Sequence, residues 1–360
     1  MIDRLRAAGG LARAAGLATA LAAAGVLLFT PPPQPEPPGP QAAALVWPAA
    51  RRTVLPADLP DGTAFTPETF ADARTAIGTA PTPDGKFLRL VVRQGGGALR
   101  ELRRLPTAGN PSVAAVASQG TTLAWVENAA DAMRVWTADL AGKAAPRQLT
   151  ADTGVARFYQ SQYDLVIAEG RVHWAGDAPG GGTEIRSVAL TGGPVAVRTE
   201  PGTWQLSAWP WLVDGVAAAS GATTLRNLST RQDVRIAAPD RSVTNCSPTW
   251  CRVVSFDDDG FPRIELMHPD GSERREVATG EVETQIPDIA IMDRFEVYAK
   301  VDANATLTGN AQILLYEIAT RRTVEISPDA SGVEFHAGVL WWTTGTQESF
   351  VRHALDLRTI

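Results

Sequence analysis

Cysteine and lysine are scarce in this sequence, and basic residues are not in excess. It has two cysteines among 360 residues, too few for a disulfide scaffold, an iron–sulfur cluster or a cysteine-based zinc site. Lys and Arg number 33 against 39 Asp and Glu, which gives a net charge of -6. Because a general nucleic-acid binder needs a basic surface, we expect no nucleic-acid partner.

Motifs of common enzymes are also missing. The sequence has no G-x-S-x-G turn, H-E-x-x-H helix, phosphate-binding loop or dinucleotide fingerprint. Its four histidines lack the spacing of metal ligands and are His173, His268, His336 and His353. The repeats described below leave no length for a separate hydrolase domain. We therefore expect no catalytic residue, no cofactor and no resident metal, and hence no enzyme.

The N-terminal region differs from the rest of the chain. Arginines within residues 1–13 precede the uncharged stretch Ala14–Thr30, whose 17 residues would form about 25 Å of helix. We predict a signal-anchor helix at 14–30, with 1–13 in the cytoplasm and the remainder outside it. A cleaved signal peptide is the alternative. The proline-rich start of residues 31–50 predicts a disordered stalk, with partner recognition as the competing interpretation.

A strand pattern repeats from about residue 50 to the end. Each copy begins with two apolar runs around a tight turn, which is typical of a β-hairpin. A third strand follows every copy, and a short fourth strand follows all but the last. The period of roughly 37 to 50 residues is that of a β-propeller blade. The hairpins are Val113–Glu127, Tyr163–Ala175, Trp204–Ala217, Val243–Ser255, Ile286–Lys300 and Val333–Thr343.

These repeats predict an all-β fold, a seven-bladed β-propeller at residues 51–360 behind the transmembrane helix. Residues 64–105 supply a further blade ahead of the six hairpins. The last blade runs out of chain after its third strand, so we expect Arg51–Pro56 to supply its fourth strand and close the ring. Six or eight blades remain alternatives.

Two short motifs resemble those of TolB-like, WD40-like propellers of bacterial extracytoplasmic proteins. Asp139-Leu140-Ala141-Gly142 followed by Arg147-Gln148-Leu149-Thr150 looks like their D-L-x-G…R-x-L-T blade ending. The segment 82–86, TPDGK, is similar to their S-P-D-G-K turn, and 268–272, HPDGS, repeats it faintly. The resemblance covers the propeller and implies a protein-binding domain outside the cytoplasm.

Three groups of residues are candidates for a specific role. Cys246 and Cys251 flank a four-residue turn, which predicts a disulfide, with two reduced core cysteines as the alternative. Asp257, Asp258 and Asp259 form a carboxylate run that is a weak metal candidate, whereas turn chemistry explains it without a metal. Trp209 and Trp211 flank a proline at a turn and are candidates for partner binding. Other tryptophans alternate with apolar residues as core positions do, namely Trp125, Trp174 and Trp341.

Acidic and basic residues fall into different connections between the predicted strands of the propeller. Connections between second and third strands, and from a fourth strand to the next blade, share one face and are mainly acidic, including Asp257–Asp259, Glu281 and Glu283. Third-to-fourth connections and the ends of the propeller are mainly basic. We call these the acidic face and the basic face. The basic residues are Arg51, Arg52, Arg93, Lys143, Arg147, Arg231, Arg274, Arg275, Arg321, Arg322 and Arg358.

Together these patterns favour a membrane-anchored, extracytoplasmic, non-catalytic docking scaffold for cell-envelope proteins. We expect the basic face to lie toward anionic lipid and the acidic face toward a cationic partner or divalent ions. The alternative is a lactonase-like or lyase-like small-molecule enzyme, with or without a metal, whose site lies at the mouth of the propeller channel.

Overall fold

Most residues that the structure describes lie in short strands. The structure is a computed structural model, and it describes residues 39–130, 132–214, 223–237, 239, 241–346 and 349–360. The chain divides into two compact units, Met1–Pro40 and Gln41–Ile360, and the second contains all the described strands and helices. The predicted cytoplasmic segment, the anchor helix at 14–30 and the start of the stalk lie outside the described residues. Within those ranges, no helix is long and apolar enough to cross a bilayer.

The described strands form six hydrogen-bonded sheets, and five of these contain only strands that follow one another in the chain. Neighbouring strands in each pair antiparallel, as hairpin connections require. The strands of these five sheets are β3 (Thr66–Asp72), β4 (Thr75–Pro81), β5 (Phe87–Gln94) and β6 (Leu99–Pro106); β7 (Ser112–Gln119), β8 (Thr122–Ala129), β9 (Ala132–Asp139) and β10 (Arg147–Thr150); β11 (Val155–Ala156), β12 (Leu165–Ala168), β13 (Arg171–Asp177), β14 (Thr183–Ala189) and β15 (Ala196–Glu200); β16 (Gln205–Leu206), β17 (Trp211–Val213), β18 (Thr223–Asn227) and β19 (Asp233–Ile236); and β20 (Ser242–Cys246), β21 (Cys251–Phe256), β22 (Pro262–Met267) and β23 (Arg275–Thr279).

The sixth sheet has eight strands because one long strand belongs to two groups. The first part of β27 pairs with β26, and its last residues pair with β28. The order is β2-β29-β28-β27-β26-β25-β24, and β1 pairs with β27 in parallel. Its strands are β1 (Gln41–Ala42), β2 (Arg52–Pro56), β24 (Val282–Thr284), β25 (Phe295–Lys300), β26 (Ala311–Glu317), β27 (Arg322–His336), β28 (Val339–Gly345) and β29 (Phe350–Asp356).

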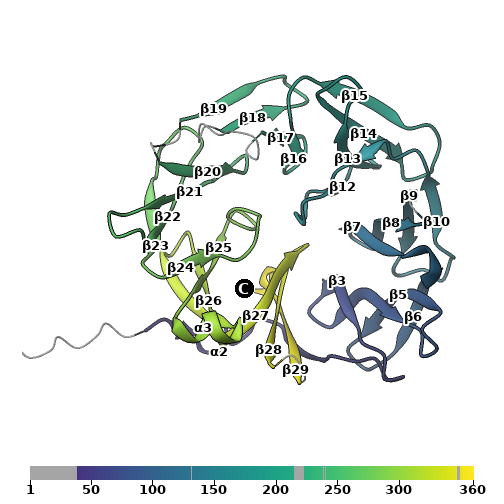
Figure 1. Ribbon diagram of the computed structural model, residues 1–360, viewed down its shortest axis with the longest axis horizontal. Coiled ribbons are helices and arrows are strands. Elements are labelled where there is room, and N and C mark those ends of the chain that lie inside the picture. The colour runs from purple at the N-terminus through teal and green to yellow at the C-terminus, as the bar shows by residue number, and fades with distance from the viewer. Residues whose placement is uncertain (1–38, 131, 215–222, 238, 240, 347–348) are drawn as a thin grey trace, which may run out of the picture. The chain divides into compact units, whose positions relative to one another are not determined.

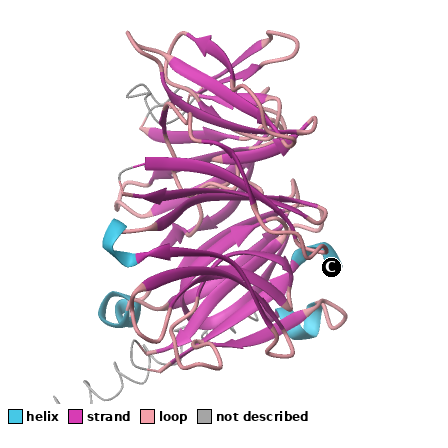
Figure 2. Cartoon of the chain, turned by 90° about the vertical axis from the view of Figure 1, so that its right-hand side faces the viewer, coloured by secondary structure: helices cyan, strands magenta, loops and turns pink. Residues whose placement is uncertain are grey.

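Within residues 41–360 the sheets follow one another in a ring around a common axis (Figure 1). This is the arrangement of a β-propeller, as the repeats predict. Two cavities lie between the inner strands, and we call this central region the channel. Short helices lie at the two faces of the ring, outside the strands (Figure 2). They are α2 (Ala43–Val46), η1 (Thr107–Gly109), α3 (Ala303–Thr308) and η2 (Leu357–Thr359).

The hydrophobic core lies between neighbouring sheets. Trp125, on β8, is fully buried against Ile77 and Leu90 of the preceding sheet. Trp174, on β13, packs in the same way against Val126 and Val135. Each sheet therefore buries its apolar faces against the next sheet. The prediction that these tryptophans are core residues is confirmed.

The N-terminal end of the described chain closes the ring. β2 pairs antiparallel with β29, from Arg52 opposite Leu355 to Pro56 opposite Val351. The sequence predicts this strand at residues 51–56, and the pairing places it there. Leu55 is only 2% exposed and contacts a cluster that contains residues of β3 and β28. The closing strand thus joins the last sheet to the first by hydrogen bonds and by packing.

Residues 41–50 differ from the disordered stalk that the sequence predicts for them. They form β1 and α2, and Ala43, Trp47 and Ala50 are buried against β25 and β28. Arg52 donates hydrogen bonds to the carbonyl oxygens of Ala43 and Trp47. Burial of the Trp47 ring holds this segment on the propeller, and a single tryptophan without periodicity gave no sign of it in the sequence.

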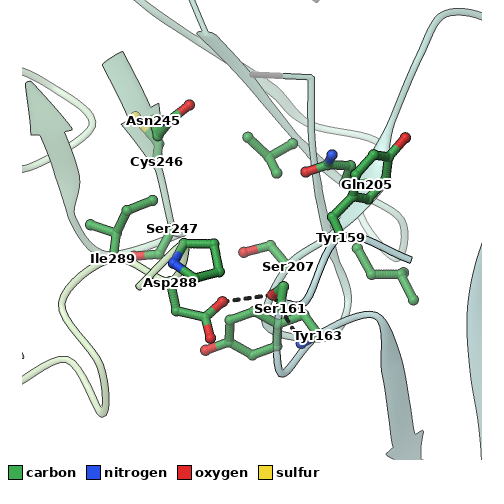
Figure 3. Close-up of a pocket in the computed structure, with 13 residues that line it drawn as sticks. Tyr159, Ser161, Tyr163, Gln205, Ser207, Asn245, Cys246, Ser247, Asp288 and Ile289 are labelled. Atoms are coloured by element: carbon green, nitrogen blue, oxygen red, sulfur yellow. Dashed lines mark hydrogen bonds between the residues drawn. The ribbon is translucent and has the colours of Figure 1, made fainter. Parts of the chain in front are cut away.

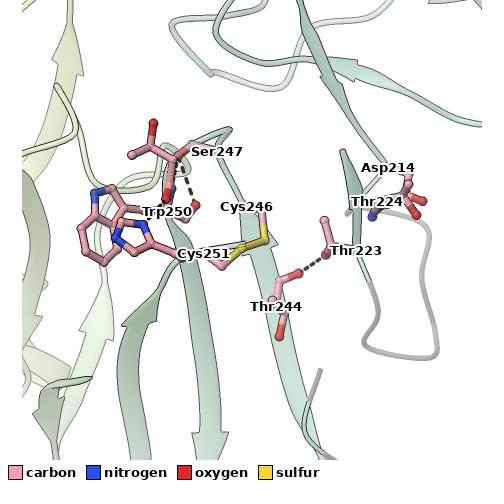
Figure 4. The surroundings of a disulfide bond; sticks show 10 residues. Asp214, Thr223, Thr224, Thr244, Cys246, Ser247, Trp250 and Cys251 are labelled. Carbon is pink, nitrogen blue, oxygen red and sulfur yellow. Dashed lines mark hydrogen bonds between the residues drawn. A yellow bond between two sulfur atoms is a disulfide. The ribbon is translucent and has the colours of Figure 1, made fainter. Parts of the chain in front are cut away.

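The two cysteines form the disulfide that the sequence predicts. Cys246 ends β20 and Cys251 begins β21, and they lie directly opposite each other with their Cα atoms 4.0 Å apart. Figure 4 shows the bond between the two strands, beside Trp250. The disulfide therefore links the two strands of the β20–β21 hairpin covalently.

We predict that the stability of the ring depends on the buried side chain of Leu55 on β2. Leu55→Ala removes a buried side chain and should lower the free energy of unfolding by about 2 to 5 kcal/mol. Val54→Ala is the matched control in the same strand, because Val54 is 62% exposed, and it should cost less than about 0.5 kcal/mol. Urea unfolding measures both values. Equal losses in the two variants would show that β2 does not pack as described.

Candidate functional site

Two segments of chain meet in the central channel. One comprises residues 157–164 before β12, and the other comprises residues 285–294 between β24 and β25. Ser161 Oγ donates a hydrogen bond of 2.6 Å to Asp288 Oδ1, and Gln162 N donates one of 3.2 Å to Asp288 Oδ2. Figure 3 shows the Ser161–Asp288 contact. Two sheets that are not neighbours in the ring are thus linked across the channel.

The first segment is shaped by the side chain of Asp164. Its carboxylate accepts hydrogen bonds from the backbone N–H groups of Tyr159 and Ser161, and its own N–H donates to the Ser161 carbonyl. Burial raises the pKa of Asp164 to about 6, although the backbone donors act in the opposite direction. These local bonds form a tight turn that places Ser161 at its tip.

The second segment is held by a buried ion pair. Arg252, on β21, is 4% exposed, and Glu296, on β25, is fully buried. Arg252 Nε donates to Glu296 Oε1 across 2.5 Å, and its two terminal nitrogens donate to the carbonyl oxygens of Ile286 and Asp288. Glu296 Oε2 accepts from Ala290 N. The ion pair therefore holds the backbone of this loop by hydrogen bonds at Ile286, Asp288 and Ala290.

Asp288 itself is 7% exposed. Burial raises its pKa, while the bonds from Ser161 and Gln162 and the nearby Arg252 favour the ionised form. A buried carboxylate is tolerated where hydrogen bonds satisfy it. The Asp288 carboxylate is therefore already bound to Ser161 and Gln162 and is not a free acid.

Two cavities share Ser161, Pro287 and Asp288 in their walls, so the contact stands between them. One has a volume of about 240 Å³ and extends to β16 and β20; we call it the Gln205 cavity. The other has a volume of about 380 Å³ and extends to β3, β7 and β27; we call it the Glu68 cavity. Concave sites with a few convergent polar groups are the usual location of ligand binding.

The Glu68 cavity contains carboxyl groups that hold protons more tightly than usual. Burial raises the pKa of Glu68 to about 7; the Thr79 hydroxyl lowers it and the Glu334 carboxylate raises it further. Burial also raises the pKa of Glu334. His336 in the same wall contacts Thr69 Oγ1 and the Val116 carbonyl, and burial lowers its pKa to about 4. At neutral pH this cavity presents a carboxyl near its midpoint, beside a neutral imidazole whose two nitrogens already have partners in the protein.

The predicted metal candidates lie elsewhere. Asp257, Asp258 and Asp259 are exposed at the turn between β21 and β22. Asp257 Oδ1 accepts from the backbone N–H groups of Asp259 and Phe261, which is the turn chemistry that the sequence offered as the simpler explanation. In the part of the chain that the structure describes, no group of three His, Cys, Asp or Glu side chains is placed to hold a metal ion.

The two candidate partner-binding tryptophans are half-buried. The Trp209 ring lies on His173 of the neighbouring sheet, with ring centroids 3.8 Å apart, and its Nε1 donates to Glu169. Trp211, on β17, packs against the cluster that contains the disulfide. Neither residue lines the Gln205 cavity or the Glu68 cavity.

Sequence reasoning missed the residues that meet in the channel. Ser161, Gln205 and Asn245 are ordinary polar residues without a motif, and only folding brings them together. The predicted strand at the start of Ile286–Lys300 is instead the channel loop, because β24 lies earlier, at Val282–Thr284. An apolar run interrupted by Pro287 and Asp288 was the one available hint.

The fold is similar to that of solved propellers. The β-propeller domain of the Trilobed protease from Pyrococcus furiosus aligns with a TM-score of 0.51 and 10% identity, over 82% of this chain and 93% of that chain. A puromycin-hydrolyzing peptidase from Mycobacterium tuberculosis aligns with a TM-score of 0.52 and 15% identity, over 88% of this chain and 53% of that chain. TolB from Acinetobacter baumannii aligns with a TM-score of 0.41 and 10% identity, over 71% and 65% respectively.

The first two likenesses show the β-propeller fold. No protein-family profile matches the sequence. The curated proteins give no match either.

One expectation has to be corrected. From the missing enzyme motifs we expected that the protein is no enzyme, but chains with this fold include a peptidase and the propeller domain of a protease. Absence of a linear motif was a weak argument, because residues from several sheets converge on a propeller channel. Enzymatic activity is therefore open for this chain.

We predict that Glu68 makes stability depend on pH. The folded state binds the Glu68 proton up to about pH 7, whereas the unfolded chain releases it near pH 4.5, so the free energy of unfolding falls as pH rises between these values. Relative to Glu68→Gln, the wild type should lose up to about 3 kcal/mol across this window. Urea unfolding from pH 4 to 8 measures the difference. Glu276→Gln, at an exposed site, is the control, and parallel curves for wild type and Glu68→Gln would contradict the assignment.

Proposed function

We propose that residues 51–360 form a seven-bladed propeller that docks a partner protein in the cell envelope. The blade count is supported by the double role of β27, whose two parts pair with β26 and β28. The path of seven strands in this sheet therefore divides into two groups of four that share β27, and β1 lies outside both groups. Seven hydrophobic clusters in the described residues also bridge successive groups around the ring. Each interface between blades accounts for one cluster.

The observation that carries the docking proposal is an exposed acidic and aromatic surface on the acidic face. Asp257, Asp258 and Asp259 lie at the β21–β22 turn, between Phe256, which is 61% exposed, and Phe261, which is 42% exposed. Glu281, on the connection that follows β23, and Glu283, on β24, are exposed as well. The N–H of Gly280 on that connection donates to the carbonyl of Pro262, the first residue of β22. Aromatic anchors within a charged rim are typical of protein interfaces. The expected partner surface is cationic.

The opposite face would lie toward the membrane. β2 begins at the basic face, since Arg52 is opposite Leu355 at the end of β29 and Arg51 N donates to Thr359 Oγ1. Much of the basic set is engaged within the protein; for example, Arg274 pairs with Glu265. Within the basic set, four exposed cations have side chains without a partner among the described residues, and they are Arg51, Lys143, Arg231 and Arg321. They suit weak attraction to anionic lipid, with attachment left to the anchor predicted at 14–30.

A second candidate function is acid–base chemistry in the Glu68 cavity. It is favoured by the Glu68 pKa of about 7, since a general acid or base works best with a pKa near the ambient pH. This candidate takes up the alternative of a small-molecule enzyme at the channel.

Photo-crosslinking at the acidic face tests the docking proposal. The photoreactive residue p-benzoylphenylalanine is placed at Phe256 or Phe261 of the full chain in the source cells, and at Val197, an exposed residue of β15, as the control position. We expect a discrete crosslinked product from the first two positions only. The triple variant Asp257→Asn, Asp258→Asn, Asp259→Asn should reduce its yield several-fold, because charge complementarity speeds encounter.

A charge-matched variant on outer strands, Glu101→Gln, Glu276→Gln, Glu325→Gln, should keep the yield. No product at Phe256 or Phe261, or the same product at Val197, would contradict docking at this face.

A further inference from the structure

We propose that the Gln205 cavity binds a neutral, hydroxyl-rich small molecule, of the chemical type of a single monosaccharide unit. The cavity lies between β16, β20 and the two channel segments. The proposal is independent of the docking face, because none of the exposed residues of that face lines the cavity.

Ser207 is the most telling group in the wall. It is 3% exposed, and its backbone N–H donates a hydrogen bond to the Trp211 carbonyl. Its hydroxyl has no hydrogen-bond partner among the described residues, and it points into the space between β16 and β20 (Figure 3). Its oxygen is not one of the unpartnered atoms that the protein encloses completely, so it is accessible from the cavity. A ligand group in the cavity would supply the missing hydrogen bond.

Gln205 presents a second unmet group next to it. Its side-chain Nε2 is enclosed by protein and donates to no atom of the described residues. A buried N–H without an acceptor costs about 1 to 3 kcal/mol. Rotation of the terminal amide exchanges its nitrogen and oxygen, so that the donor faces the cavity and the oxygen takes the enclosed position, likewise without a partner among the described residues. The amide is thereby able to offer either a donor or an acceptor to a ligand.

Three more polar side chains complete the wall without a partner in the described chain. They are the amide of Asn245, from β20, and the phenolic hydroxyls of Tyr159 and Tyr163. Every one of these groups, like Ser207 and Gln205, both donates and accepts hydrogen bonds. Ligand hydroxyls have the same double capacity, so a polyol matches this wall more fully than a pure donor or a pure acceptor.

The charge of the wall excludes a strongly ionic ligand. Asp288 is the only carboxylate that lines it among the residues the structure describes, and Ser161 and Gln162 already donate hydrogen bonds to it. No Lys, Arg or His side chain in the described ranges lines the cavity. Burying an unpaired ligand charge here would be costly. The ligand is therefore neutral.

Apolar surface on the remaining wall suits the C–H face of a sugar ring. Tyr159 is 38% exposed, and Leu206 and Ile289 flank the polar groups. The volume of about 240 Å³ is below the usual range of drug-sized pockets, roughly 300 to 1,000 Å³. One compact ring fits such a space better than an extended peptide.

Saturation-transfer NMR on the full chain tests the proposal. The probes are the methyl glycosides of glucose, galactose, mannose and N-acetylglucosamine, with N-acetyl-alanyl-alanine amide as the peptide arm. We expect saturable binding of at least one glycoside. Ser207→Ala, which is nearly isosteric, and Gln205→Leu should each weaken it about tenfold, the effect of one good hydrogen bond.

Gln232→Leu, at an exposed position of a surface turn, is the matched control and should leave binding unchanged. Circular dichroism of each variant establishes that it folds, and Ser207→Ala carries the test if Gln205→Leu does not. Binding of the peptide amide in place of the glycosides, binding of no glycoside, or glycoside binding unchanged in Ser207→Ala would each overturn the proposal.

Discussion

The buried pair of Arg252 and Glu296 is the constraint on which the channel depends. The two groups lie in neighbouring sheets. The guanidinium donates to the carbonyl oxygens of Ile286 and Asp288, and the carboxylate accepts from the N–H of Ala290. Removing one partner of a buried pair leaves an uncompensated charge, which costs about 3 to 5 kcal/mol. With the loop held in this way, Asp288 projects to Ser161 on the far segment. The division of the channel into two cavities follows from that contact.

The propeller supplies the rigid frame for this arrangement. Its apolar residues are buried between sheets rather than within a single layer, and β2 closes the circle against β29. Inner strands are therefore fixed from both sides, while their connections are free to vary. Function placed on such connections depends on loops held by a scaffold, which is a common division of labour. The same frame is compatible with docking, with small-molecule binding and with catalysis.

The sequence was informative where the physics is local or periodic. Alternation around Trp125 and Trp174 predicted buried hairpins, and the short spacing of Cys246 and Cys251 predicted their disulfide. It was uninformative where contacts join distant segments. Ser161 and Asp288 are 127 residues apart, and neither carries a motif. Within the blade predicted at residues 64–105, the strand β3 gives little local signal, because Thr66–Asp72 contains proline and charged residues in place of an apolar run.

Hydrogen exchange at two amides tests the central claim most directly. The N–H of Gln162 donates to Asp288 of the opposite segment, and the N–H of Ala290 donates to the buried Glu296. If the ion pair and the channel contact exist as described, both amides should exchange as slowly as amides within the strands, although neither lies in one. The exposed amide of Lys143 provides the reference for an unprotected loop. Exchange of Gln162 and Ala290 at the rate of Lys143 would contradict the account.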